Sequence, residues 1–147
     1  MSLKLIRTYL EDRLQEIDPA FERVEKPFDT EEAGKNNFDR RFHIFYADIS
    51  GSVANQNTTL DTINGTVVLY FDGGRDDQTK LDDALDVANA FRMRCMNPKL
   101  LKNEKFIKRF VANSVIASPL DSNDNQIKIT LKFSISAMFG TNDDLNC

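Results

Sequence analysis

His43 and Cys95 carry the side chains of this chain best suited to catalysis, because imidazole can transfer a proton and a thiolate can act as a nucleophile. His43 is the only histidine, and it falls in a segment whose alternation is typical of a strand. Cys95 falls on the apolar side of a predicted helix, which is typical of an inert, buried thiol. Folding could still bring His43 beside Cys95 or an aspartate, so a small hydrolase or nuclease remains an alternative hypothesis.

Residues 121–125 could bind a cation, because Asp and Asn alternate there as they do at the start of a calcium-binding loop. The rest of that pattern is absent, since its sixth position is Gln126 instead of Gly and its twelfth is Lys132 instead of Glu. A turn between two strands explains the same residues more simply. We therefore interpret this segment as a polar turn.

A second acidic segment, residues 72–77 with the sequence DGGRDD, separates a predicted strand from a predicted helix. Its glycine pair resembles a phosphate-binding turn, but the spacing matches neither the dinucleotide fingerprint nor the P-loop. Its aspartates would repel phosphate, although Asp72, Asp76 and Asp77 could together attract a cation. A solvated entry to the helix is the simpler interpretation, and we predict neither a cofactor nor a metal.

Alternating hydrophobicity predicts the strands that hold these residues. The clearest pattern lies near the end of the chain, where seven apolar residues occupy every second position: Ile127, Ile129, Leu131, Phe133, Ile135, Ala137 and Phe139. It predicts a strand over residues 125–139, paired with a strand over residues 104–118. Central strands are predicted over 39–49 and 62–72, and a short strand over 21–26.

Two segments show the helical spacing of apolar residues. In residues 3–17 the apolar residues share one face and the charged residues share the other. Residues 78–96 form the second predicted helix, with Asp77 or Thr79 as its cap. Residues 98–103 can add one further turn. The order of elements predicts an α+β fold: a mostly antiparallel sheet of four to five strands with two helices packed on one face.

Length and composition are those of one globular domain that covers residues 1–147. The polar segments 27–38 and 50–60 are predicted to be mobile loops, and residues 140–147 a frayed tail. The net charge of −4 argues against a general nucleic-acid binder, which needs a cationic surface. No stretch approaches the roughly 18 apolar residues of a membrane span, so we expect no contact with a membrane.

The predicted strand over residues 104–118 is apolar on both faces. Six residues divide between these faces: Phe106, Phe110 and Ile116 on one, and Ile107, Val111 and Val115 on the other. Such a strand is either covered by helices on one side or packed against another subunit. Basic residues also gather on the last two strands: Lys105, Lys108, Arg109, Lys128 and Lys132. They could meet nucleic acid or an acidic protein surface, but a solvated face whose lysines discourage aggregation explains them slightly better.

The whole pattern resembles the tail terminator proteins of long-tailed, lambda-like bacteriophages, the siphoviruses. The similarity lies in the order of the elements and covers nearly the whole chain. A helix over residues 3–17 precedes central strands that end at residues 67–71 with the sequence VVLYF. An acidic break with glycines then opens a second helix, and a hairpin turns at residues 121–125 before the long final strand over 127–139.

This resemblance implies that six copies form a homohexameric ring at the head-proximal end of the tail tube. The ring would end tube polymerisation and present an attachment surface to a head completion or neck protein, while DNA passes through its centre. The implied partners are further copies of the chain, the tail tube protein and the neck protein. The implied location is the virion, at the head–tail junction, after assembly in the host cytoplasm. The resemblance implies no catalysed reaction and no cofactor.

Contacts that close a ring need complementary charges on separate patches of the subunit. We predict that charged residues of two loops and of the start of the first central strand make these contacts: Asp72, Arg75 and Asp76 in one loop, Asp121 and Asp124 in the hairpin turn, and Arg40 and Arg41 at the start of the strand. A solvated surface is the alternative interpretation for each of them. Two further functions remain open, namely another head–tail joining or tail completion protein, and a cellular protein-binding module.

Overall fold

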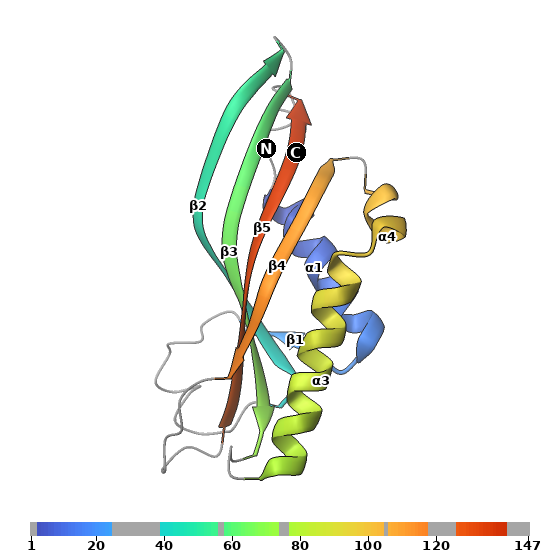
Figure 1. Ribbon diagram of the computed structural model, residues 1–147, viewed down its shortest axis with the longest axis vertical. Coiled ribbons are helices and arrows are strands. Elements are labelled where there is room, and N and C mark those ends of the chain that lie inside the picture. The colour runs from blue at the N-terminus through green and yellow to red at the C-terminus, as the bar shows by residue number, and fades with distance from the viewer. Residues whose placement is uncertain are drawn as a thin grey trace.

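The computed structural model describes residues 3–24, 39–55, 58–73, 77–104, 106–117 and 126–140. Its elements follow in this order: α1 (Leu3–Ile17), β1 (Glu22–Arg23), β2 (Arg41–Asn55), β3 (Thr58–Asp72), α3 (Gln78–Cys95), α4 (Pro98–Lys102), β4 (Ile107–Ala117) and β5 (Gln126–Gly140). The strands form one sheet in the order β1-β2-β3-β5-β4, and the helices lie on one side of it (Figure 1).

The predicted α+β class and the mostly antiparallel sheet are confirmed, because β2, β3, β5 and β4 all pair antiparallel. The sheet is nevertheless mixed, since β1 pairs with β2 in parallel. The described residues contain three helices instead of the two predicted. The third, α4, begins where the Asn97 side chain accepts a hydrogen bond from the Lys99 amide at 2.9 Å and Pro98 occupies the first turn.

The predicted loop over residues 50–60 is wrong, because β2 runs to Asn55 and β3 starts at Thr58. The ladder continues through this region as far as the pair formed by Asn55 and Thr58. Polar composition suggested a loop, but β-branched threonines favour strands, and a solvated ladder tolerates polar side chains. The second predicted loop, 27–38, lies outside the described residues. The predicted tail over 140–147 also starts too early, because Gly140 pairs with Thr58, and residues 141–147 lie outside the described part.

The face assignment predicted for β4 is wrong as well. Ile107 and Phe110 were assigned to opposite faces, yet both are buried in the core together with Ala112. The register of β4 against β5 shifts between Ile107 and Arg109 and again between Val111 and Ser114. An extra residue at each bulge breaks the period of two, so the simple odd-and-even rule fails along this strand.

The core lies between the sheet and the helices, and it contains the alternating residues of β5. Those from Ile127 to Ala137 are at most 4% exposed, which confirms their predicted face. The helices contribute apolar residues at helical spacing: Ile6, Tyr9, Leu10 and Leu14 from α1, and Ala84, Ala88, Phe91 and Cys95 from α3. The Asp77 side chain caps α3 by accepting a hydrogen bond from the Lys80 amide at 3.2 Å, as one of the two predicted caps.

Tyr9 joins the two long helices inside this core. Its hydroxyl donates a hydrogen bond of 2.8 Å to the backbone carbonyl of Cys95, the last residue of α3. The last carbonyls of a helix have no partner within the helix, so this bond satisfies a group that would otherwise be buried alone. Burial, together with the nearby Cys95, raises the pKa of Tyr9 to about 12.

We expect replacement of Tyr9 by Phe to flatten the alkaline loss of stability. An unfolded tyrosine ionises near pH 10, whereas folded Tyr9 keeps its proton until about pH 12. The unfolded chain therefore binds fewer protons in this window, and the free energy of unfolding falls as the pH rises from 10 to 12. In urea unfolding at pH 8 and pH 11, the loss between the two pH values should be smaller for Tyr9→Phe than for the wild type. Equal losses would contradict this assignment.

Candidate assembly interface

One end of the sheet holds the three predicted interface residues that the structure describes. β2 and β5 begin there and β3 and β4 end there, because these strands are antiparallel neighbours (Figure 1). The structure places Arg40, Arg41 and Asp72 at this end. The other predicted residues, Arg75, Asp76, Asp121 and Asp124, lie outside the described residues, in segments that follow β3 and β4 from this same end.

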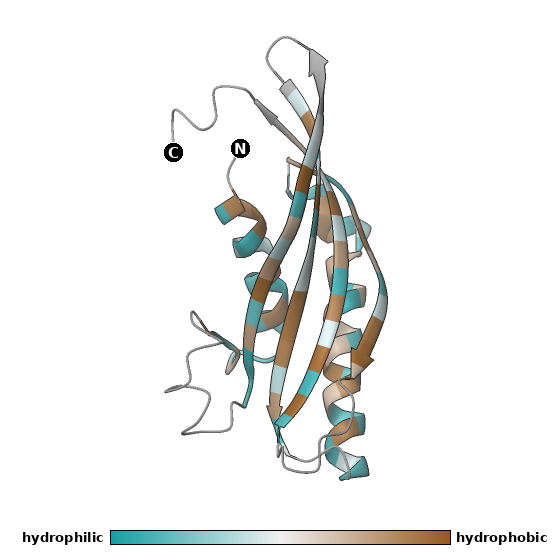
Figure 2. Cartoon of the chain, turned by 90° about the vertical axis from the view of Figure 1, so that its left-hand side faces the viewer, coloured by the Kyte–Doolittle hydropathy of each residue, from teal (hydrophilic) through white to brown (hydrophobic). Residues whose placement is uncertain are grey.

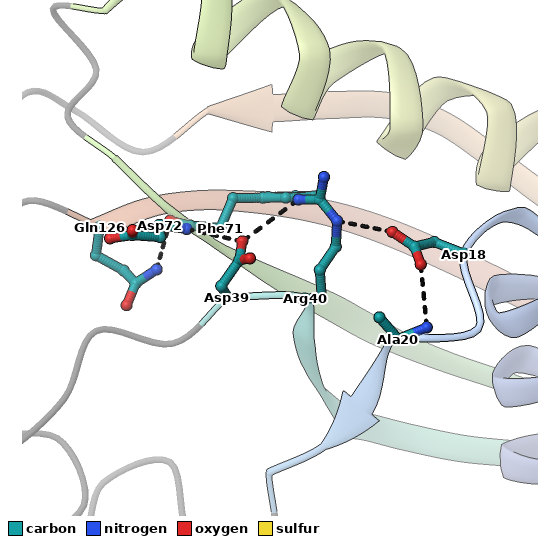
Figure 3. Close-up of polar contacts among 7 residues, drawn as sticks. All are labelled: Asp18, Ala20, Asp39, Arg40, Phe71, Asp72 and Gln126. Atoms are coloured by element: carbon teal, nitrogen blue, oxygen red, sulfur yellow. Dashed lines mark hydrogen bonds and ion pairs between the residues drawn. The ribbon is translucent and has the colours of Figure 1, made fainter.

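Arg40 holds this end together through its guanidinium group (Figure 3). Its Nε donates a hydrogen bond to Asp18 Oδ2 at 2.7 Å, and its Nη1 donates one to Asp39 Oδ1 at 3.4 Å. The guanidinium carbon lies 5.1 Å from the centre of the Phe71 ring, in a cation–π contact. These contacts connect the turn after α1, the start of β2 and the end of β3.

Backbone bonds complete the same cluster. The Arg40 carbonyl accepts a hydrogen bond from the Glu22 amide at 3.0 Å, which aligns β1 with β2. The Asp39 carboxylate accepts from the Asp72 amide at 3.2 Å, and the Asp18 carboxylate accepts from the Ala20 amide at 3.0 Å. Arg40 itself adopts a φ of 56°, in the left-handed region that L-residues other than glycine rarely occupy. The contacts of its side chain therefore offset part of the cost of this backbone conformation.

We expect Arg40→Gly to be more stable than Arg40→Ala, which reverses the usual order of these two residues. Both variants lose the ion pairs with Asp18 and Asp39 and the cation–π contact, each worth up to about 1 kcal/mol at a partly exposed site. Alanine keeps the left-handed penalty of roughly 1–2 kcal/mol, whereas glycine removes it. Urea unfolding of the two variants measures the difference, and an alanine variant at least as stable as the glycine variant would show that Arg40 is not under this strain.

Arg41 and Asp72 are more accessible than Arg40. Arg41 pairs with the Glu22 carboxylate across β1 and β2, and the two side chains are 41% and 66% exposed. Exposed ion pairs of this kind contribute little to stability, about 0–1 kcal/mol. Asp72 is exposed at the last position of β3, where Gln126 Nε2 donates to the neighbouring Phe71 carbonyl at 2.5 Å. Arg41 and Asp72 thus remain reachable from solution, whereas Arg40 acts within the subunit.

The outer sheet face, which we define as the face turned away from the helices, is not covered by any of the described helices (Figure 2). Its residues on β5 and β3 are mostly hydroxyl-bearing, amide or basic: Lys128, Thr130, Lys132, Ser134 and Ser136, opposite Tyr70, Val68, Thr66, Asn64 and Thr62. Lys128 and Lys132 are both exposed and lie four residues apart on one strand, so they point the same way. We call these two residues the lysine patch.

The opposite side of the subunit is acidic along α3. Asp82, Asp83 and Asp86 are exposed, and we call them the acidic patch. The buried residues Ala84 and Ala88 turn toward the sheet, so the helical period directs Asp82 and Asp86 away from it. Like charges at positions i and i+4, here Asp82 and Asp86, destabilise an isolated helix slightly. A positive charge from another molecule would relieve this repulsion and stabilise α3.

The residues considered for catalysis do not form a reactive pair in the structure. His43 Nδ1 donates to the Val24 carbonyl at 2.5 Å, and the ring packs on the edge of Phe45 with centroids 4.4 Å apart. Cys95 is fully buried, and this burial raises the pKa of its thiol. The prediction of a buried thiol is confirmed. Within the described ranges, no three His, Cys, Asp or Glu side chains are grouped so that they could hold a metal ion.

Two features of the structure were not foreseen from the sequence. Asp18 was not among the predicted interface residues, although it forms an ion pair with Arg40. Asp61 is 9% exposed in the middle of the β2–β3 ladder, directly opposite Gly51. A Cβ atom at Gly51 would lie 2.1 Å from the Asp61 carboxylate, so the glycine makes room for this carboxylate. A single glycine inside a polar strand was the available signal for such a close approach.

Comparison with models of known protein families finds no match, and a search of curated proteins finds none either. Among the described helices, none combines the length and apolar character needed to cross a lipid bilayer. The site must therefore be interpreted from its own geometry: one charged end of a sheet, an open sheet face with a lysine patch, and an acidic patch on the opposite side.

Proposed function

We propose that this chain is a structural protein of a long-tailed bacteriophage that assembles into a ring and terminates the tail. In this role it caps the head-proximal end of the tail tube, ends tube polymerisation and provides the surface to which the head attaches. The resemblance in the order of elements suggests a tail terminator and a homohexamer. The ring acts at the head–tail junction of the virion, after assembly in the host cytoplasm.

The observation that supports ring formation is the placement of the two charged patches. The lysine patch lies on the outer sheet face and the acidic patch lies on α3, on the other side of the subunit. A head-to-tail contact uses different surfaces of the two subunits, and closed rings are built from such contacts. Complementary charges also speed association and fix which surfaces meet. The lysine patch of one copy can thus contact the acidic patch of the next.

The charged end of the sheet is the surface proposed for the other partners. Asp72 is exposed there and the Arg41 side chain is 41% exposed, while Arg75, Asp76, Asp121 and Asp124 follow β3 and β4 in the sequence. In a ring of identical subunits this end takes an equivalent position in every copy, and we propose that it contacts either the tail tube protein or the neck protein. DNA passes through the ring without sequence recognition, and the role requires no cofactor and no catalysed reaction.

The experiment that tests this function is interruption of the gene in its phage, followed by electron microscopy of the lysate. A terminator predicts tails without heads that are longer than wild-type tails, because polymerisation no longer stops. Expression of the wild-type chain from a plasmid should restore the normal length. Tails of normal length that fail to join heads would contradict a terminator and assign the chain to another head–tail joining step. Intact particles would remove the tail function altogether.

A further inference from the structure

Asp61 carries a buried carboxylate on the inner sheet face, which we define as the face that holds the core. Asp61 lies two residues before Ile63 on β3, and Ile63 is fully buried in the core. Successive residues of a strand alternate between its two faces, so both side chains point to the inner face. Asp61 is 9% exposed, and it lies opposite Gly51 on β2 and Ala137 on β5.

The Asp61 carboxylate has fewer hydrogen bonds than a buried charge requires. Among the described residues its donor is Thr59, whose Oγ1 lies 3.5 Å from Asp61 Oδ2, at the long limit for such a bond. No basic side chain in the described part of the chain forms an ion pair with Asp61. A carboxylate can accept about four hydrogen bonds, and a buried charge is unfavourable unless it is paired. Asp61 therefore favours a cationic group from outside the subunit.

An exposed glycine gives access to this carboxylate. A Cβ atom at Gly51 would lie 2.1 Å from Asp61 Oδ1, so the carboxylate occupies the space of the missing side chain. Gly51 is exposed, and Ile49, which pairs with Ile63 on the same face, is 41% exposed. The β2–β3 hairpin also extends past the described helices (Figure 1). A long basic side chain has an apolar stem and a charged end, so its stem can pack on Ile49 while its charge reaches Asp61.

Arg109 is a basic residue whose position on the outer sheet face matches that of Asp61 on the inner face. Arg109 pairs with Ser136 of β5, and the next residue, Ala137, pairs with Asp61. Phe110 is buried, so the alternation along β4 turns Arg109 to the outer face, where it is exposed. Asp61 and Arg109 therefore lie at nearly the same level along the strands. A guanidinium group is weakly hydrated and pairs with a carboxylate through two hydrogen bonds, so arginine suits a buried ion pair better than lysine does.

The head-to-tail contact proposed above can join these two residues as well as the charged patches. The lysine patch lies in the first half of β5 and the acidic patch in the first half of α3. These two halves lie at the same end of the sheet, because Lys80 of α3 and Ile127 of β5 both lie beside Gly73. Asp61 and Arg109 lie toward the other end, near the starts of β3 and β4. When neighbouring copies point in the same direction, both pairs of complementary charges meet.

We propose that the Arg109 guanidinium of one copy binds the Asp61 carboxylate of the next copy, with its stem on Ile49. This inference rests on the proposed ring and adds a second charge pair to the contact between its subunits. The free subunit keeps a buried carboxylate that a correctly placed second copy neutralises. Copies that meet in another register leave this charge unpaired, so the pair also selects the correct contact.

A double-mutant cycle on self-assembly tests the proposal. The wild type, Asp61→Asn, Arg109→Gln and the double variant are compared by native mass spectrometry and sedimentation over a range of concentrations. We expect each single variant to weaken assembly about tenfold or more, because it leaves one charge unpaired at the contact. The double variant should assemble no worse than either single variant, since residues in contact do not have additive effects. Lys108→Gln, which removes the neighbouring exposed charge, should assemble like the wild type.

Several results would overturn the proposal. Normal assembly of Arg109→Gln would exclude the pair, and so would additive losses in the double variant. Equal losses from Arg109→Gln and Lys108→Gln would show that only the net charge matters. A wild type that stays monomeric at every concentration would overturn the ring and this inference together. Assembly lost in Lys128→Glu/Lys132→Glu but kept in Arg109→Gln would overturn this inference alone. Urea unfolding shows which variants are folded, and the exposed Arg109 keeps the test decisive even if Asp61→Asn does not fold.

Discussion

Gly65→Ala is expected to destabilise the fold by about 1–3 kcal/mol, because it adds a methyl group where the core has no space. Gly65 lies in β3 between Tyr46 of β2 and Phe133 of β5. A Cβ atom there would lie 2.5 Å from the Phe45 carbonyl oxygen and 2.6 Å from Phe133 Cζ. The carbonyl belongs to the sheet backbone, and the Phe133 ring stacks on Phe110 with centroids 5.9 Å apart. Neither neighbour can move without disturbing the ladder or the core.

Gly51→Ala provides the matched control for this prediction. It makes the same substitution in the same pair of strands, but its close contact is the Asp61 side chain at 2.1 Å. Only the far end of the Asp61 side chain has to move, so we expect a smaller loss than for Gly65→Ala, below about 1 kcal/mol. Urea unfolding of both variants gives the comparison. If Gly65→Ala were as stable as Gly51→Ala, the packing described around Phe133 would be incorrect.

Reversal of the lysine patch is expected to weaken self-assembly more than tenfold. The double variant Lys128→Glu/Lys132→Glu places negative charges where the proposed ring contact would bring Asp82 and Asp86 of the next copy. Charge pairs buried at protein interfaces contribute about 1.5–7 kcal/mol, and about 1.4 kcal/mol already changes an equilibrium constant tenfold. Native mass spectrometry and sedimentation over a range of concentrations measure the shift from rings to monomers.

Assembly of the wild type should also weaken between about 0.1 M and 1 M salt, because the screening length falls from about 10 Å to about 3 Å.

The reciprocal change makes this prediction specific. Asp82→Lys/Asp86→Lys alone should also block assembly, and the combination of all four substitutions should restore it. Lys4→Glu/Lys102→Glu changes the net charge by the same amount as the lysine-patch variant, at exposed positions outside both patches. This control should assemble like the wild type. Rings that form normally from the lysine-patch variant would exclude this contact while leaving ring formation by another surface intact.

The parts of the fold that were predicted correctly are those in which a regular element buries one whole side. β5 and α3 follow periods of two and 3.6 without interruption, because one side of each contacts the core along its length. The strands that were predicted poorly violate this condition. Two bulges interrupt β4, and the far part of the β2–β3 hairpin consists of polar residues held by backbone pairing, which leaves little trace in composition.

The predicted site shows a similar division. Arg41 and Asp72 do lie at one end of the sheet, as predicted from their places in the sequence. Antiparallel topology brings the start of β2 beside the end of β3. The role of Arg40 could not be predicted in this way. Its ion pair with Asp18 spans 22 positions, and no local pattern indicates which of many acidic residues an arginine will meet.

The β2–β3 hairpin, together with the end of β5, projects beyond the helices as an arm (Figure 1). A bulge between Tyr46 and Asp48 marks its base, and Ile49 and Leu60 on the arm are 41% and 37% exposed. Amide protons of the arm depend only on the strand ladder and should exchange with deuterium through local opening, whereas those beneath the helices should need global unfolding. Slower deuterium uptake at the amides of the arm would therefore show that another molecule has covered it.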